Sequence, residues 1–141
     1  MQAELSLIAL TDAEKKIPQF ILGLLSLLVL DAVWLSVTTR VGLYEAAFNK
    51  REVRAWYGLI AWASLAFGIS ILNYKSNWYR ATLWGSCVGL IGYGTFNGTE
   101  AAIRSDWRKA KVIAADMCWG TFACSVASVS TNRIMQAVCA C

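Results

Sequence analysis

Apolar residues gather in four long runs along the chain, separated by short polar connectors. The runs cover residues 17–39, 53–73, 79–97 and 111–131. A hydrocarbon core about 30 Å thick needs about 20 mostly apolar residues in a helix, so each run is long enough to cross a bilayer. Barrel strands are shorter and alternate between apolar and polar side chains. The pattern therefore predicts an all-α, polytopic membrane protein, a bundle of four transmembrane helices.

The stretches outside these runs are too short for a second domain. The connectors cover residues 40–52, 74–78 and 98–110. The N-terminal segment lacks the early basic region of a cleaved signal peptide. We therefore expect one membrane domain over residues 1–141, with residues 1–16 and 132–141 as interfacial or flexible tails.

The composition agrees with a membrane protein. The chain is 57% hydrophobic and 16% charged, whereas a soluble domain is about 45–50% apolar and about 25% charged. So few charges cannot cover the surface of a water-soluble globule of this size. The single proline and the many aromatic residues exclude collagen and disorder.

Two acidic residues fall inside apolar runs, and each belongs to an Asp-x-x-Trp pattern. Asp31 precedes Trp34, and Asp116 precedes Trp119. This spacing places each acid and its tryptophan on one helix face. An aspartate at membrane depth costs about 2.5–3.5 kcal/mol on insertion scales, so both acids must face the bundle or water.

The depth of these acids predicts that they lie close together. Asp31 lies nine residues before Arg40, and Asp116 lies five residues after Lys111. Helices joined by short loops alternate in direction, so both acids fall in the half of the membrane that faces the first and third loops. The third run ends on that side too. We expect one polar intramembrane layer formed by Asp31, Trp34, Asn97, Thr99, Glu100, Asp116 and Trp119.

Three roles are open for this polar layer. It could be a hydrogen-bond network that sets the register of the helices, which we favour. It could handle protons or ions, because intramembrane acids often mark relays. It could also bind a lipid head group or a metal ion through its acids.

Small residues predict close helix contacts in the third and fourth runs. Such residues allow helix backbones to approach each other in lipid. We expect packing within the chain, with a homo-oligomer contact as the alternative, at Gly85, Gly89, Gly92, Gly94, Gly98 and Gly120.

Basic residues favour one orientation in the membrane. Eight gather at the first and third loops: Arg40, Lys50, Arg51, Arg54, Arg104, Arg108, Lys109 and Lys111. Five lie toward the opposite side: Lys15, Lys16, Lys75, Arg80 and Arg133. This bias predicts that loops one and three are cytoplasmic and contact anionic lipid head groups. The net charge of +4 is explained by these flanks, so we expect no nucleic-acid partner.

Common catalytic motifs are missing from the sequence. The chain has no histidine, the commonest general base and zinc ligand. It has no phosphate-binding glycine loop and no Gly-x-Ser-x-Gly elbow. We therefore expect no catalytic residues, no metal and no cofactor.

Several motifs, taken in order, resemble the predicted membrane protein family called domain of unknown function 2177. They are Leu-Asp-x-x-Trp-Leu at Leu30–Leu35, a glycine- and aromatic-rich segment at Gly89–Glu100, Trp107, and Asp-x-x-Trp-Gly-Thr at Asp116–Thr121. The resemblance covers roughly residues 20–130. The family's Asp and Asn in the third helix are Asn97 and Glu100 here, and Arg108 replaces its proline.

The resemblance implies four membrane helices and no established activity. Similar proteins occur in bacteria and in large DNA viruses, which implies a cell membrane or a virion internal membrane. We therefore predict a structural or organising role in the membrane, with a capsid or other shell protein as a partner in the viral case. The alternatives are a proton-coupled or small-solute transporter that uses the intramembrane acids, and a lipid-modifying enzyme.

Overall fold

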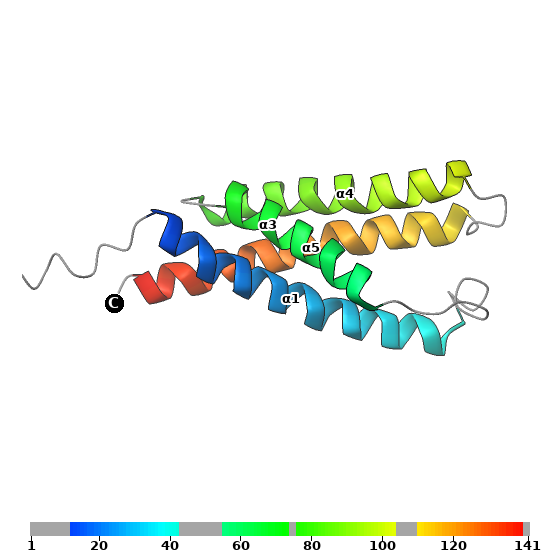
Figure 1. Cartoon of the computed structure of the whole chain (residues 1–141), viewed down its shortest axis with the longest axis horizontal. Helices are drawn as coiled ribbons and strands as arrows, with labels where there is room; N and C mark the ends of the chain where they lie inside the picture. The colour runs from blue at the N-terminus through cyan, green and yellow to red at the C-terminus, as the bar shows by residue number, and fades with distance from the viewer. Residues whose placement is uncertain (1–11, 43–54, 74–75, 104–109, 140–141) are drawn as a thin grey trace, which may run out of the picture.

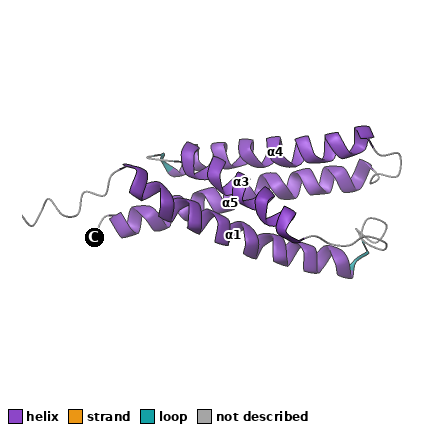
Figure 2. Cartoon of the chain, viewed as in Figure 1, coloured by secondary structure: helices purple, strands orange, loops and turns teal. Residues whose placement is uncertain are grey.

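The computed structural model describes residues 12–42, 55–73, 76–103 and 110–139, in which all regular structure is helical (Figure 2). The helices are α1 (Asp12–Arg40), α3 (Ala55–Leu72), α4 (Trp78–Ile103) and α5 (Ala110–Cys139). Helices α1, α4 and α5 each cover one predicted apolar run, and α3 covers residues 55–72 of the run predicted at 53–73. The all-helical class is therefore confirmed.

Three helices are longer than their apolar runs. Helix α1 begins at Asp12, α4 continues to Ile103, and α5 continues to Cys139. Residues 12–16 and 132–139, which fall in the predicted interfacial or flexible tails, are therefore helical. The C-terminal part of α5 contacts the start of the α4 segment: Asn132 is buried and donates a hydrogen bond to the carbonyl of Ser76.

Two helix ends carry local stop and start signals. Helix α1 is followed by Gly42 at φ 66°, a left-handed conformation that suits glycine at a helix C-terminus. Helix α4 starts after Asn77, whose Oδ1 accepts a hydrogen bond from the backbone N–H of Arg80 at 2.9 Å. This contact is an N-terminal cap.

The helices form an elongated bundle in which α5 contacts each of the other three (Figure 1). Helices α4 and α5 run side by side along its length. The start of α1 and the end of α5 lie at one end of the bundle, whereas the end of α1, the end of α4 and the start of α5 lie toward the other. Helices α1 and α5 are therefore antiparallel, as the alternation of direction predicts.

Glycines set the close contact between α4 and α5. A Cβ atom added at Gly85 would lie 2.5 Å from the carbonyl oxygen of Cys124, and one at Gly89 would lie 2.2 Å from that of Gly120. Only a residue without a side chain fits at such distances. The small-residue face of α4 therefore packs directly on the backbone of α5.

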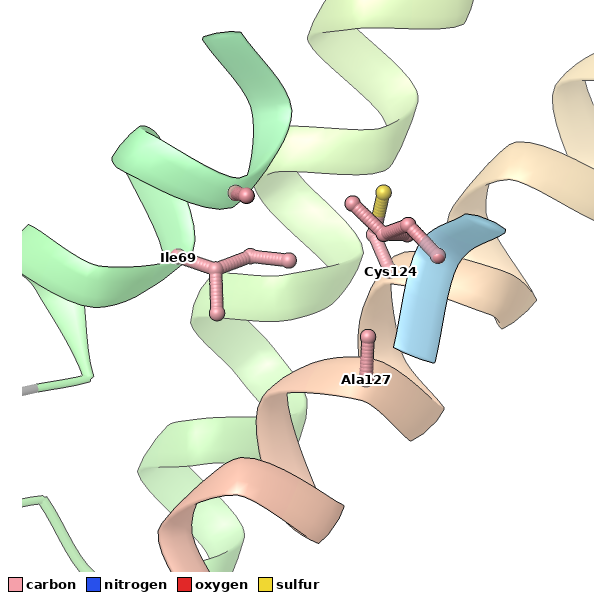
Figure 3. Close-up of a cluster of buried hydrophobic side chains, with 5 residues drawn as sticks. Ile69, Cys124 and Ala127 are labelled. Atoms are coloured by element: carbon pink, nitrogen blue, oxygen red, sulfur yellow. The ribbon is translucent and has the colours of Figure 1, made fainter. Parts of the chain in front are cut away.

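A small apolar core lies where α1, α3 and α5 meet. Ile69 points from α3 toward Cys124 and Ala127 of α5 (Figure 3), and Leu27 of α1 and Ala66 of α3 complete the cluster. All five side chains are fully buried. The three helices are thus joined by one apolar contact near the middle of the bundle.

The rest of the bundle has apolar residues outside and polar residues inside. One outward stripe of α1 repeats every four residues: Ile17, Ile21, Leu25, Val29, Val33 and Val37. The buried polar residues include Asp31, Asn73, Asn97, Asp116 and Asn132. This distribution suits a lipid environment, where polar side chains turn inward.

Two of the helices are long and apolar enough to cross a membrane. The segments are Lys15–Arg40 and Ala110–Val138, and Trp56–Leu72 is a shorter apolar helix. Membrane association is therefore supported by these helices and by the exposed apolar surface.

Candidate functional site

The carboxylate of Asp31 is the centre of a buried polar cluster that involves every described helix. It projects from α1 and accepts hydrogen bonds from Trp62 of α3, Tyr93 of α4 and Trp119 of α5. The indole N–H of Trp62 and the hydroxyl of Tyr93 donate to Oδ2 at 2.5 and 2.9 Å. The indole N–H of Trp119 donates to Oδ1 at 2.7 Å. One side chain thereby joins four helices.

The three donors to Asp31 are all neutral groups. An ionised carboxylate only accepts hydrogen bonds, and it can accept several at its two oxygens. Hydrogen bonds to a charged acceptor are roughly twice as strong as neutral ones. Trp62, Tyr93 and Trp119 are therefore placed to stabilise the ionised form of Asp31 without neutralising its charge.

The two Asp-x-x-Trp patterns face each other across α1 and α5. The rings of Trp34 and Trp119 stack with centroids 4.7 Å apart and an interplanar angle of 4°. Trp119, from the second pattern, also donates to Asp31, from the first. Because α1 and α5 are antiparallel, the two patterns lie at the same level along the bundle.

Asp116 and Asn97 form the second part of the cluster. The side-chain amide of Asn97 donates to Oδ2 of Asp116 at 2.8 Å and to the carbonyl of Tyr93 at 2.9 Å. Both side chains are buried. The amide oxygen of Asn97 is buried and has no hydrogen-bond partner in the part of the chain that the structure describes. Asn97 therefore links α4 to Asp116 of α5.

A cavity of about 570 Å³ lies beside these side chains. Both acids line it, together with residues from all four described helices. Most of the remaining lining is apolar or aromatic: Trp34, Leu35, Tyr57, Trp62, Leu65, Tyr93 and Phe96. The site is thus an apolar cavity with carboxylates on its wall.

A family described as "Predicted membrane protein (DUF2177)" matches residues 17–132. The chain belongs to this family. The match confirms the resemblance stated from the sequence motifs, and it spans every residue of the Asp31 cluster. No curated protein and no solved structure shows a significant match.

One of the predicted site residues of this DUF2177 protein, Thr99, lies away from the cluster. Thr99 is exposed, and its hydroxyl donates to the carbonyl of Thr95 on its own helix. It lies about 200° around α4 from Asn97, at about 100° per residue, so it faces away. Glu100 is half-buried on α4.

Gly98 makes no close contact with another helix in the described part of the chain. A Cβ atom there would meet no described atom within 4 Å. Gly98 lies about 180° around the helix from Gly89, at about 100° per residue, so it cannot share the face that meets α5. Gly92 and Gly94 instead lie against the side chains of Leu65 and Met117.

The sequence analysis missed Trp62 and Tyr93 as site residues. Both lie well inside apolar helices, away from the membrane interfaces where aromatic belts form. Buried Trp and Tyr usually find a hydrogen-bond partner for the polar end of the ring. A mid-helix Trp and Tyr opposite an intramembrane Asp are the signal that could have found them.

Most of the predicted basic contacts lie outside the described residues: Lys50, Arg51, Arg54, Arg104, Arg108 and Lys109. Arg40 and Lys111, which the structure describes, are both exposed. They flank the two helix ends that lie nearest to Asp31 and Asp116 in the sequence.

A second polar network holds the opposite end of the bundle, and the sequence analysis did not predict it. Asn73 donates to the carbonyl of Ser128 at 2.7 Å and accepts a hydrogen bond from the hydroxyl of Ser76. Asn132 donates to the carbonyl of Ser76 at 2.8 Å. The network ties the turn between α3 and α4 to α5.

This second network predicts opposite effects for two substitutions. We expect Asn73→Ala to lower the free energy of unfolding by about 1–3 kcal/mol, because the carbonyl of Ser128 loses its donor. Thr131 is fully buried, and its hydroxyl has no hydrogen-bond partner among the described residues. Thr131→Val removes that hydroxyl at nearly constant shape, so it should leave stability unchanged or raise it. Unfolding midpoints in a neutral detergent provide the measurement, and equal losses for both variants would contradict this account.

Proposed function

We propose that this protein is a four-span membrane protein whose role is structural. In this proposal all four helices cross the bilayer, and the Asp31 cluster sets their register. One observation supports it most directly: the Asp31 carboxylate accepts a hydrogen bond from each of the other three described helices. Such an arrangement specifies one packing of the bundle, because any rotation of a helix would leave a buried donor unpaired.

The basic residues near loops one and three suit a role in organising the membrane. Cytoplasmic loops carry an excess of Lys and Arg, and such segments attract anionic lipid. The proposal therefore places this end of the bundle on the cytoplasmic side, against lipid head groups or a protein shell. In a virus, that shell would be the capsid around an internal membrane.

The structural role is tested with the double variant Asp31→Asn/Asp116→Asn. We expect a lower yield of folded protein in detergent, because Trp119 and Asn97 lose carboxylate acceptors. We also expect proteoliposomes of the wild-type protein to show no proton flux above protein-free vesicles. A wild-type flux that the double variant abolishes, while the variant remains folded, would overturn the structural proposal.

A second candidate function is solute transport, and the cavity favours it. Intramembrane acids commonly mark the pathway of an ion or a substrate. Here both acids lie on the wall of a cavity of about 570 Å³. Uptake of a radiolabelled solute into proteoliposomes is the readout that separates transport from a purely structural role.

A further inference from the structure

The cavity beside Asp31 has the size and the lining of a small-molecule site. Its volume of about 570 Å³ falls within the range of about 300–1,000 Å³ that is typical of such sites. Asp31 and Asp116, which line it, are only 5% and 6% exposed. The cavity therefore combines a mostly apolar wall with carboxylates that are shielded from bulk water.

The charge on this wall favours a cation. The described hydrogen bonds of Asp31 all come from neutral indole and phenol groups. Among the residues that the structure assigns to the lining there is no lysine or arginine. Electrostatic attraction is stronger in an apolar surrounding than in water. A cation that enters would therefore gain from Asp31, whereas an anion would be repelled.

The aromatic side chains favour an organic cation over a metal ion. Trp, Tyr and Phe rings attract cations over their faces, and the gain is largest when the contact is desolvated. The rings of Trp62 and Tyr93 are positioned by their hydrogen bonds to Asp31, and that of Trp34 by stacking on Trp119. An inorganic cation such as Ca²⁺ needs six to eight oxygen ligands, which this mostly apolar wall does not supply.

We propose that this cavity binds a hydrophobic organic cation of the quaternary ammonium or phosphonium class. The charge lies against Asp31, and the apolar groups lie among Trp34, Trp62, Tyr93 and Phe96. This inference deepens the second candidate function, but it requires only binding and no movement across the membrane. It is independent of whether the protein also organises the bilayer.

The first test compares two probes of the same shape and opposite charge. The full-length protein in a neutral maltoside detergent is titrated with tetraphenylphosphonium and, separately, with tetraphenylborate by calorimetry. We expect saturable binding of the cation alone, because both ions partition into detergent but only the cation is attracted to Asp31. Equal binding of the two ions would overturn the proposal.

Competition experiments distinguish the natural sources of such a cation. Displacement of tetraphenylphosphonium by both tetramethylammonium and phosphocholine would assign the site to the choline head group of a lipid. Displacement by tetramethylammonium alone would assign it to a free organic cation, because the phosphate of phosphocholine would be repelled by the carboxylates. Failure of both to compete, even at high concentration, would overturn the assignment of the charge to this cavity.

Variants distinguish a loss of binding in the cavity from a loss of folded protein. We expect Asp31→Asn and Ala61→Phe each to lower the affinity for tetraphenylphosphonium by about tenfold or more. Ala61 lines the cavity and takes no part in the hydrogen bonds of Asp31, so Ala61→Phe fills the site and keeps the cluster. Ala32→Phe is the matched control, since Ala32 is exposed on α1 and does not line the cavity. Unchanged affinity in folded Ala61→Phe protein would overturn the proposal.

The outcomes for binding and for function are separable. Binding without solute uptake into vesicles would support the site and remove the transport function. Absence of binding would remove this inference, and the structural role of Asp31 would then still be decided by the folding yield and the proton flux of the double variant.

Discussion

The Asp31→Ala variant should unfold far more easily than the wild-type protein, and Asp31→Asn should lie between the two. Alanine leaves Trp62, Tyr93 and Trp119 without an acceptor, and each buried unpaired donor costs about 1–3 kcal/mol. Asparagine keeps one oxygen. If that oxygen takes the place of Oδ2, it retains the two donors from Trp62 and Tyr93, and only Trp119 faces an amide N–H.

The hydrogen bonds that Asp31→Asn keeps and loses predict how a second substitution changes stability. In Asp31→Asn, the bond from Trp119 is already lost, so adding Trp119→Phe should cost less than it does in the wild-type protein. Adding Tyr93→Phe should cost nearly its full amount, because that bond persists. Double-mutant cycles on unfolding midpoints in neutral detergent measure both differences.

Ser36→Ala is a suitable control for the Asp31 series. Ser36 lies on the same helix, is exposed, and donates only to the carbonyl of Ala32 in the described contacts. Its loss should change stability little. An Asp31→Ala protein as stable as Ser36→Ala would show that the cluster does not hold the helices together.

Gly89→Ala should separate α4 from α5, with a loss of about 1–3 kcal/mol from overpacking. The added Cβ would lie 2.2 Å from the carbonyl oxygen of Gly120 and 2.8 Å from the Cα of Thr121. Both are backbone atoms, which cannot rotate away as a side chain does. The helices must therefore move apart along their longest contact.

Gly120→Ala should act on the Asp31 cluster as well as on packing. Its Cβ would lie 2.1 Å from the ring of Tyr93, and Tyr93 donates to Asp31. The ring must move, so the variant should lose stability and also weaken this hydrogen bond. The loss of stability caused by Gly120→Ala should therefore be smaller in a Tyr93→Phe protein, where this hydrogen bond is already absent.

Gly98→Ala is the matched control for the glycine variants. No described atom lies within 4 Å of a Cβ added at Gly98, and alanine favours a helix over glycine by up to about 1 kcal/mol. We expect unchanged or slightly higher stability. Unfolding midpoints of all three variants, measured in one detergent, test the account, and a Gly89→Ala protein as stable as Gly98→Ala would contradict it.

The level of the two acids along the bundle could be predicted from the sequence. Each residue advances a helix by about 1.5 Å, and short connectors force neighbouring helices to alternate in direction. Asp31 and Asp116 therefore had to fall in the same half of the bundle, and Asn97 with them. The structure places Asn97 in a hydrogen bond with Asp116, and Trp34 in a stack with Trp119.

The side that each helix turns toward its neighbours could not be predicted in the same way. Helix α3 is apolar almost all around, so its sequence carries no signal for the side that meets α1, and Trp62 was missed. In α4, small residues occur on more than one side. Gly89 meets α5, whereas Gly98 lies on the opposite face. Rotation about a helix axis is set by contacts with its neighbours, which local sequence does not contain.

By itself, the sequence predicted an all-helical membrane protein, because its long apolar runs fit membrane helices and not the short, alternating strands of a barrel. It also determined the level at which the acids lie. Only the tertiary structure decided that Trp62, Tyr93 and Trp119 converge on one carboxylate, that Asn73 and Asn132 hold the other end, and that a cavity remains beside Asp31. Those features depend on how four helices rotate and approach one another, and close packing between whole surfaces sets that arrangement.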